Sequence, residues 1–381
     1  MAERGVDYQE GFEMKKIICG IMLVTLAPWA TAQQASPEAL FKQWDKNKDG
    51  KLLSAELPQS ARRNFAKVDT NKDGAISLEE HVRFLKRPRR AQPRQPKGVT
   101  VLRDIPYAGT ENPRQMLDLI LPLKRAGKKP LPVIAFIHGG GWRNGNKSSG
   151  VNRVAGLVQT GRYVGVSIGY RLTGEAIWPA QIHDCKAAIR WLRGNAKKHG
   201  MDPDKIAVWG SSAGGHLVSM LGSTGGVKEL EGKLGKHLGQ SSRVSAVVNY
   251  YGPSALLQMD DHPGRMKHNA PNSPESLLVG APIQEAKSKT RQVSPLTHVS
   301  KDDAPHLHVH GTKDPLVPFH QSQIYHAALK KVGVESTLIT VKEGGHNAPR
   351  AVGENQVRLF LGRHLRGKGE KLADETVPTN R

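Results

Sequence analysis

The chain has 381 residues, and its 56 Lys and Arg outnumber its 34 Asp and Glu to give a formal net charge of +22. This length allows one large domain with a single core and a small additional unit. The basic residues are spread over the chain and form no recognised nucleic-acid-binding motif, so we expect no nucleic acid as a partner. We expect the charge to favour solubility or attraction to an anionic polysaccharide or envelope surface.

Residues 1–32 have the organisation of a secretory signal peptide, with Met14 as the expected true start. Two lysines precede an apolar run over 17–26, and small residues at 30–32 provide a cleavage site. The run is too short for a membrane span, so the sequence predicts a secreted or periplasmic bacterial protein with no transmembrane segment. Without the signal, Cys185 is the single cysteine and no internal disulfide is possible.

Two segments within 33–86 match the loop of an EF-hand and predict an all-α EF-hand pair. Both loops have oxygen-bearing side chains at the ligand positions, and a glycine at the sixth position, Gly50 or Gly74, permits the sharp bend. A hard cation such as Ca²⁺ takes about six to eight oxygen ligands. The expected ligands, including the backbone carbonyl at position seven, are Asp45, Asn47, Asp49, Lys51 and Glu56 in the first loop and Asp69, Asn71, Asp73, Ala75 and Glu80 in the second.

The second loop conforms better to the EF-hand pattern than the first. Its ninth position holds the polar Ser77, whereas the first loop has Leu53 there. Turns rich in Asp, Asn and Gly that bind no metal are the alternative interpretation of both loops. The short connection between the loops indicates a compact calcium module with a structural role.

Residues 87–99 form a basic linker with several prolines. Such a segment repels itself and cannot be helical throughout. The polar tail over 368–381 is expected to be flexible. The sequence therefore predicts one large domain over 100–367, separated by the linker from the EF-hand pair.

The segment 100–367 alternates between strand-like and helix-like patterns. This alternation predicts an α/β fold with a mostly parallel eight-stranded sheet flanked by helices, and a functional site at the carboxyl ends of the strands. Strands are expected near 100–105, 115–121, 132–137, 163–169, 205–209, 244–250, 305–310 and 336–341. Helices are expected near 147–160, 179–199, 213–222, 319–332 and 353–365. The interruption over 252–304 predicts a cap over the site, and its polarity argues against a lipase lid.

The apolar strand near 132–137 runs into His138-Gly139-Gly140-Gly141-Trp142. Glycine amides can approach an anion closely, so Gly139, Gly140 and Gly141 are candidate donors to an oxyanion. Two of the three are expected to act, and the pattern leaves open which two.

The segment Gly210-Ser211-Ser212-Ala213-Gly214 follows an apolar strand and precedes a helical segment. It fits the G-x-S-x-G nucleophile elbow, in which glycines flank the serine because the strand and helix backbones nearly touch. Ser212 is therefore the candidate nucleophile, and the amide of Ala213 is a further oxyanion donor. A serine in an ordinary turn is the alternative.

A candidate acid and a candidate base follow at the ends of later strands. Asp314 comes after the strand near 305–310, and His346 after the strand near 336–341. A serine hydroxyl is a poor nucleophile until a base takes its proton, so His346 must reach Ser212 and Asp314 must hold the imidazole tautomer. The chain order Ser, Asp, His is that of an α/β-hydrolase triad.

Other residues compete for these two roles. Asp302 and Asp303 precede their strand and therefore belong at the wrong end of the sheet. His320 and His326 fall in a helical segment, and His310 lies too close to the acid in sequence.

Aromatic residues at strand ends are candidates for lining an acyl or aromatic pocket, although such residues are more often part of the core. They are Trp142, Tyr170, Trp178, Tyr250 and Tyr251. His216, on the helix after the elbow, is expected to be buried scaffold.

From about Thr100 to Gly367 the chain resembles α/β-hydrolases of the esterase and lipase group, and its His-Gly-Gly-Gly-Trp is similar to that of hormone-sensitive-lipase-like esterases. It most resembles the bacterial bifunctional feruloyl and acetyl esterases. The segments that carry the resemblance are 138–142, 178–181, Asp184, 209–216, 314–315 and 345–346. In that family Ser212, Asp314 and His346 would form the catalytic triad.

The resemblance implies a secreted serine carboxylesterase that hydrolyses short-chain acyl, acetyl or feruloyl esters of carbohydrates through an acyl-enzyme, with a small-molecule or polysaccharide ester as substrate. Catalysis of this kind needs no cofactor. A lipase and a prolyl-oligopeptidase-like peptidase are the alternatives, although the segment 33–99 is too short for the propeller of such peptidases. A non-catalytic binding module is a further alternative, but no triad member is missing.

Overall fold

The computed structural model describes residues 36–62, 64–86, 95–262, 264–347 and 350–379. The chain divides after Gln92 into two compact units. The predicted signal peptide and most of the predicted linker lie outside the described residues. Within the described ranges, no helix combines the length and the apolar character needed to cross a bilayer.

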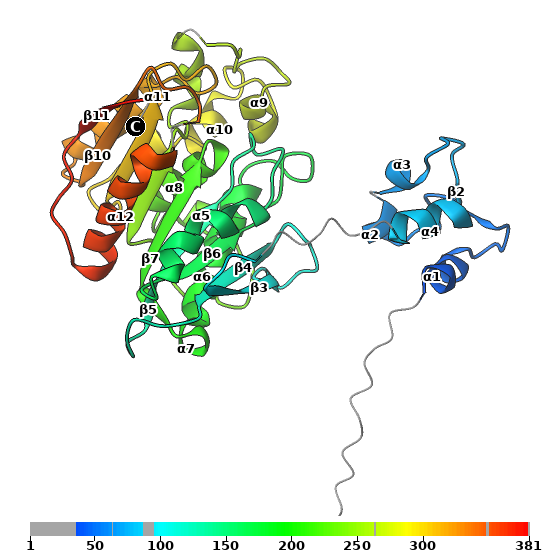
Figure 1. Ribbon diagram of the computed structural model, residues 1–381. Helices are drawn as coiled ribbons and strands as arrows, with labels where there is room; N and C mark the ends of the chain where they lie inside the picture. The colour runs from blue at the N-terminus through cyan, green and yellow to red at the C-terminus, as the bar shows by residue number, and fades with distance from the viewer. Residues whose placement is uncertain (1–35, 63, 87–94, 263, 348–349, 380–381) are drawn as a thin grey trace, which may run out of the picture. The chain divides into compact units, whose positions relative to one another are not determined.

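The first unit consists of two short helix–loop–helix segments (Figure 1). Antiparallel pairing of β1 with β2 joins the two loops and places Leu52 opposite Ile76. Both side chains are buried together with Phe41, Leu57 and Val68, which gives the unit its own small core. Its elements are α1 Pro37–Trp44, β1 Lys51–Leu52, α2 Gln59–Arg62, α3 Phe65–Val68, β2 Ile76–Ser77 and α4 Leu78–Lys86.

The second unit is built on a nine-stranded sheet in the order β11-β10-β9-β8-β7-β5-β6-β4-β3. The strands from β6 to β11 in that order pair in parallel, and β4 and β3 add an antiparallel edge. The carboxyl ends of the central strands therefore share one edge of the sheet. The strands are β3 Val99–Pro106, β4 Met116–Pro122, β5 Leu131–Ile137, β6 Val164–Ile168, β7 Met201–Ser211, β8 Ala246–Tyr250, β9 His306–Gly311, β10 Ser336–Lys342 and β11 Glu375–Pro378.

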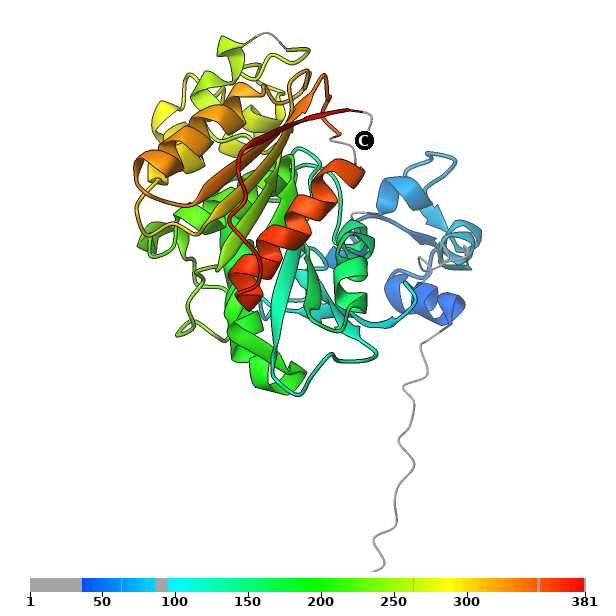
Figure 2. The same ribbon diagram turned by 60° about the vertical axis from the view of Figure 1, so that its left-hand side comes forward.

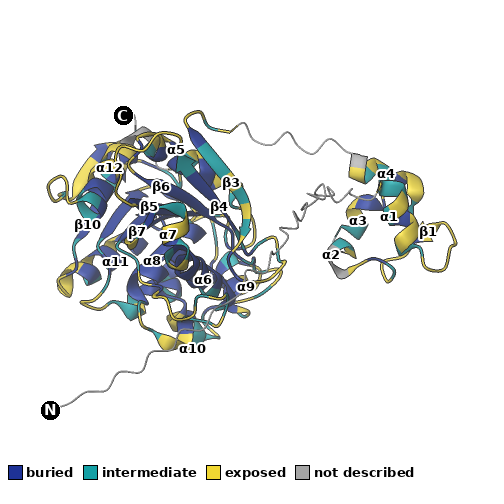
Figure 3. Ribbon diagram, turned by 90° about the horizontal axis from the view of Figure 1, so that it is seen from below, coloured by how far each residue is buried: buried dark blue, intermediate teal, exposed yellow. Residues whose placement is uncertain are grey.

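Helices cover both faces of this sheet, and its strands are buried between them (Figures 2 and 3). On one face, α5 and α12 pack their apolar side chains against the strands, and on the other α6 and α8 do the same. The sequences of β5, β6 and β8 are continuously buried, as expected for strands covered on both faces. The helices are α5 Ser148–Gln159, α6 Ala180–Gly194, α7 Ala196–His199, α8 Ala213–Ser223, α11 His320–Lys331 and α12 Arg350–Arg366.

Short helical turns occupy the long connection between β8 and β9, where the sequence predicts a cap. They are η2 Leu256–Asp261, α9 Pro274–Val279, α10 Lys287–Gln292 and η3 Pro295–His298, and η1 Lys228–Leu230 precedes β8. Ser273 begins α9 by accepting a hydrogen bond from the Ser276 amide, and Gly280 ends it in a left-handed conformation.

The structure confirms the mostly parallel α/β arrangement, but the expectation of eight strands and of a wholly flexible tail is wrong. Glu375–Pro378 forms a ninth strand, β11, which pairs in parallel with Ile339–Lys342 of β10. The segment is short and polar, and Val377 is its single buried side chain. The strand forms because it pairs with β10, which is distant in sequence, and its own residues show no apolar pattern that would predict a strand.

Candidate active site

Ser212 lies in the turn between β7 and α8, with φ +55° and ψ −125°. Its amide donates a hydrogen bond of 2.8 Å to the Tyr250 carbonyl. The flanking glycines are required sterically, because a Cβ on Gly210 would lie 2.2 Å from the Gly214 carbonyl oxygen and one on Gly214 would lie 2.1 Å from the Ile137 carbonyl oxygen. The serine is thus held in a strained backbone conformation of the kind found at nucleophile elbows.

The glycine run after β5 packs directly against this turn. A Cβ on Gly139 would lie 2.6 Å from the Ser211 carbonyl oxygen, and Gly140 has a φ of +117°. In the described part of the chain, the amides of Gly139, Gly140, Gly141 and Ala213 donate no hydrogen bond. All four residues line the same cavity as Ser212. They are therefore available to an anionic oxygen there.

Asp314, in the loop after β9, is the hydrogen-bond partner of His346. His346 donates from Nδ1 to Asp314 Oδ2 over 2.7 Å, and the amides of Leu316 and Val317 donate to Oδ1 over 2.8 and 2.9 Å. Burial by itself would raise the pKa of Asp314, but hydrogen bonds from His310 and His346 outweigh it and hold that pKa below its ordinary value. The acid stays ionised, which keeps the proton on Nδ1 of His346.

Ser212 and His346 face one cavity of about 420 Å³. The serine and imidazole form no direct hydrogen bond in this conformation, and such contacts commonly tighten only when substrate binds. The Tyr251 ring packs 4.6 Å from the His346 ring, centroid to centroid. Besides the glycine run and the elbow, the lining consists of Trp142, Arg143, Asn144, Tyr251, Pro253, Met266, Pro274, Glu275, Leu316, Val317 and Asn347.

Two buried aromatic contacts hold the glycine run in place. Tyr170 stacks on the His138 ring at 4.4 Å and donates from its hydroxyl to the His138 carbonyl over 2.9 Å. Trp142 donates from its indole to Nδ1 of His216, which in turn donates from Nε2 to the Val293 carbonyl. Burial lowers the pKa of His216 to about 4, so it remains neutral and can accept from the indole at neutral pH.

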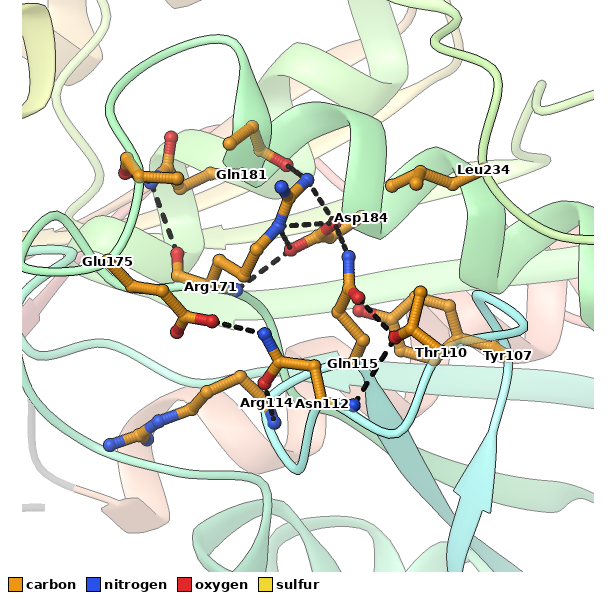
Figure 4. A network of polar contacts seen from close by, with 12 residues as sticks. Tyr107, Thr110, Asn112, Arg114, Gln115, Arg171, Glu175, Gln181, Asp184 and Leu234 are labelled. Atoms are coloured by element: carbon orange, nitrogen blue, oxygen red, sulfur yellow. Dashed lines mark hydrogen bonds and ion pairs between the residues drawn. The ribbon is translucent and has the colours of Figure 1, made fainter. Parts of the chain in front are cut away.

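A buried polar network includes Arg171, the residue after Tyr170, together with Gln115 and Asp184 (Figure 4). Asp184 on α6 accepts from Gln115 Nε2 over 2.7 Å and from both the amide and the guanidinium of Arg171. Arg114, beside Gln115, donates to the Gly145 carbonyl over 2.5 Å. The network thus connects the residues before β4, the segment after β6 and the end of the glycine-rich loop, and it explains the fully buried Asp184.

The structure corrects the pocket prediction for three of the five aromatic residues. Trp142 and Tyr251 line the cavity, whereas Tyr170, Trp178 and Tyr250 lie in the core and do not. Trp178 donates to Gln292, and Tyr250 packs against Trp209. A position at a strand end does not determine which way a ring points, since neighbouring side chains point to opposite faces.

None of the competing acids and bases that are described below takes the place of Asp314 or His346. Asp303 lies before β9, and His326, on α11, pairs with Ser336 and Asp374. His310 is buried against Asp314, with Nε2 donating over 3.2 Å to Oδ2. Sequence reasoning missed this supporting contact, and it also missed Met266 and Glu275 in the cavity lining.

Both EF-hand loops have the hydrogen bonds expected of a closed calcium loop. The Gly50 amide donates to Asp45 and the Gly74 amide to Asp69, over 3.0 and 3.1 Å. The remaining oxygen, Oδ1, of both aspartates is buried and has no partner in the described ranges. A bound cation would satisfy these two oxygens.

Glu80 closes the second loop at its last ligand position. The hydrogen bond from the Ser77 amide, with further ones from Thr70, outweighs the effect of burial and lowers the pKa of Glu80 to about 2. Across the described residues, no group of three or more His, Cys, Asp or Glu side chains is arranged to hold a metal. The predicted donor sets also use asparagine and backbone oxygens, which is the all-oxygen chemistry that Ca²⁺ prefers.

Comparison with known proteins agrees with this architecture. The EF hand profile matches residues 64–85, which contain the second loop. Esterase LipC of Mycobacterium tuberculosis is 32% identical over 222 residues, covering 58% of this chain and 54% of that protein. The chain spans about half the length of the curated relatives it matches.

Two solved structures are similar over most of the second unit. A truncated carbohydrate esterase from gut microbiota has a TM-score of 0.63 and 33% identity, covering 69% of this chain and 93% of that one. An acetyl ester-xyloside bifunctional hydrolase from Caldicellulosiruptor lactoaceticus has a TM-score of 0.54 and 25% identity, covering 68% and 92%. The BD-FAE family profile matches residues 117–329, more than half of the chain and the segment that carries the elbow and Asp314. With its α/β-hydrolase sheet and nucleophile elbow, the chain belongs to the BD-FAE family.

Proposed function

We propose that the second unit is a serine carboxylesterase with Ser212 as nucleophile, His346 as base and Asp314 as the acid that orients it. The observation that carries this proposal is the convergence of an elbow serine, an aspartate-paired histidine and unpaired amides on one cavity. The esterase names of the relatives and structural neighbours support it.

The reaction follows from the positions of these groups. His346 Nε2 takes the Ser212 proton as Oγ attacks the ester carbonyl, and the carbonyl electron pair moves onto the oxygen that faces the free amides. The C–O bond to the alcohol then breaks, and His346 returns the proton to the leaving alkoxide. A water molecule then attacks the acyl-enzyme while His346 takes its proton. The ester bond to Ser212 breaks, His346 returns the proton to Oγ, and the acid is released.

We propose short-chain acyl, acetyl or feruloyl esters of carbohydrates as the substrates. The cavity of about 420 Å³ is small, and its lining mixes apolar side chains with Asn144, Glu275 and Asn347. A lining of this kind suits a small acyl group on a polar alcohol better than a long lipid chain. Neighbours named for carbohydrate esters support this class.

Hydrolysis of p-nitrophenyl acetate, butyrate and octanoate beside methyl ferulate tests the proposal. We expect turnover of the short or feruloyl esters, and a loss of more than about 10⁴-fold in kcat for Ser212→Ala. Ser219→Ala, on the same helix but away from the cavity, is the matched control and should retain activity. Absence of turnover by the wild-type protein would instead favour a peptidase or a binding protein.

We further propose that the EF-hand pair binds Ca²⁺ in a structural role and that the chain is exported by residues 1–32. The two buried, unpartnered aspartate oxygens support the first proposal. Export would place the basic chain near acidic polysaccharide or the cell envelope. Cell fractionation tests export, and retention on a uronate polymer that does not change between low and high salt would contradict the surface attraction.

A further inference from the structure

A buried carboxylate, that of Glu275, lies in the lining of the catalytic cavity. Glu275 is in α9 of the cap (Figure 1), far in sequence from the elbow and from both partners in the proposed triad. Its side chain is only 5% exposed, yet it lines the same cavity as Ser212 and His346. The proposed chemistry gives this carboxylate no role, because Asp314 already serves His346.

The hydrogen bonding of Glu275 is incomplete. Its Oε2 lies 3.1 Å from Nδ1 of His268, whose side chain is 2% exposed. The two atoms are close but poorly aligned, since neither has a hydrogen-bond partner in the described part of the chain. A buried carboxylate with so few partners is costly unless another donor reaches it.

The surrounding structure holds this pair in place rather than letting it turn to solvent. The His268 amide donates to Asp260 Oδ1 over 2.7 Å, and the His268 carbonyl accepts from the Ser276 hydroxyl over 3.3 Å and from that of Ser273. Ser273 in turn begins the helix that carries Glu275. The carboxylate is therefore fixed at the cavity wall by the fold of the cap.

Arg143, Asn144 and Asn347 line the same cavity, but in the described part of the chain none of them donates a hydrogen bond to Oε2 of Glu275. Met266, Pro274, Leu316 and Val317 are apolar. An alkyl group bound there would leave the carboxylate unpaired, whereas a hydroxyl group would donate to it. Sites built to bond a hydroxyl group discriminate strongly against analogues that lack it.

We propose that Glu275 determines specificity for the alcohol part of the substrate, by accepting a hydrogen bond from a free hydroxyl group near the ester, as on a partly acetylated sugar ring. This inference rests on the proposed esterase function and adds a residue that selects among esters. Glu275 acts on binding and orientation and transfers no proton.

The test compares two acetates of similar size, a monoacetylated methyl xyloside and cyclohexyl acetate, which differ in the hydroxyl groups on the ring. We expect Glu275→Leu to lower the ratio of their kcat/KM values about 10- to 100-fold, because a hydrogen bond to a charged group is lost for the sugar ester alone. Glu275→Gln keeps the shape and one acceptor and should fall between wild type and Glu275→Leu.

Glu285→Gln is the matched control, because Glu285 is an exposed glutamate of the same cap and should leave the ratio unchanged. Thermal melting of each variant separates misfolding from a change in specificity. Equal losses of kcat/KM on both esters would overturn the inference, as would an unchanged ratio of the two kcat/KM values in a folded Glu275→Leu protein. So would a larger loss on acetylcholine than on the sugar ester, since Glu275 would then recognise positive charge.

Failure of the esterase proposal gives a different result. In that case the wild-type protein would cleave neither acetate, or Ser212→Ala would be as active as wild type. Only an active wild-type enzyme with an unchanged ratio counts against Glu275.

Discussion

At the scale of single residues, the acid of the site is held more firmly than the base. Asp314 accepts hydrogen bonds from two histidines and two amides, whereas His346 forms one hydrogen bond among the described residues, to Asp314, and packs against the Tyr251 ring. His310 also donates to the Val317 carbonyl, and its Nδ1 accepts from Ser322 over 2.8 Å. His310 is therefore a positioning residue that sets the direction in which Asp314 faces His346.

Replacing the acid tests this arrangement. Asp314→Asn keeps the shape but offers His346 an amide, which favours the wrong imidazole tautomer. We expect kcat on p-nitrophenyl acetate to fall on the order of 10⁴-fold, with KM little changed. Asp303→Asn is the control at the other end of the sheet. A loss below about tenfold would show that another acid orients the histidine.

At the scale of elements, the glycine-rich loop after β5 depends on contacts from two other segments. Tyr170, after β6, holds its first residue, and His216 of α8 holds its last through Trp142. Glycine restricts its backbone dihedral angles little. The direction of the loop amides therefore depends on the contacts made by Tyr170 and Trp142.

Loss of the Tyr170 hydroxyl should therefore affect the transition state more than substrate binding. We expect Tyr170→Phe to lower kcat about 3- to 30-fold while KM stays nearly constant, since one neutral hydrogen bond to the loop is lost. Tyr163→Phe, at a buried tyrosine outside the cavity, should leave both constants unchanged. A rise in KM alone would assign Tyr170 to substrate binding instead.

At the scale of the whole molecule, several histidines are buried without charge. Burial lowers the pKa of His138, His216 and His306 to about 4, and that of His308 well below its ordinary value. The stacked pair of His306 and His308 is fully buried between β9 and α11. These histidines therefore bind protons less readily in the folded chain than in the unfolded chain.

This difference predicts the dependence of stability on pH. Between about pH 4 and 6.5 the unfolded chain binds more protons than the folded chain, so the free energy of unfolding falls as the pH falls through that window. Above about pH 6.5 these histidines add little to the pH dependence of the free energy of unfolding. We expect the melting temperature to drop steadily from about pH 6.5 to about pH 5 in calorimetry, and a less steep drop for His306→Gln. A melting temperature that is flat over this range would contradict the assignment.

The EF-hand unit has its own core and is expected to respond to calcium independently of catalysis. In calorimetric titration of the full chain, Glu80→Gln should weaken Ca²⁺ binding about 10- to 100-fold, because it removes a carboxylate from the last ligand position. Glu79→Gln is the matched control, since Glu79 is exposed and pairs with Arg83.

Chelation should then lower the thermal stability of the first unit and leave the esterase activity of residues 98–381 unchanged. Loss of that activity on chelation would show that the two units are not functionally separate.

Features that depend on local geometry can be predicted from the order of the residues. The elbow at Ser212 needs glycines on both sides, the calcium loops need oxygens at set spacings, and buried parallel strands need continuous apolar runs. Each requirement is met within a dozen or so residues, so the α/β class, the positions of Asp314 and His346 at strand ends and the second EF-hand loop could be predicted.

The contacts between distant segments became visible in the folded chain and could not be predicted. In the structure Tyr170, Trp178 and Tyr250 lie in the core, and Glu275 of the cap lines the cavity. His310 contacts Asp314, and β11 pairs with β10. These outcomes depend on side-chain direction and on contacts across many residues of sequence, which the period of a local pattern does not encode.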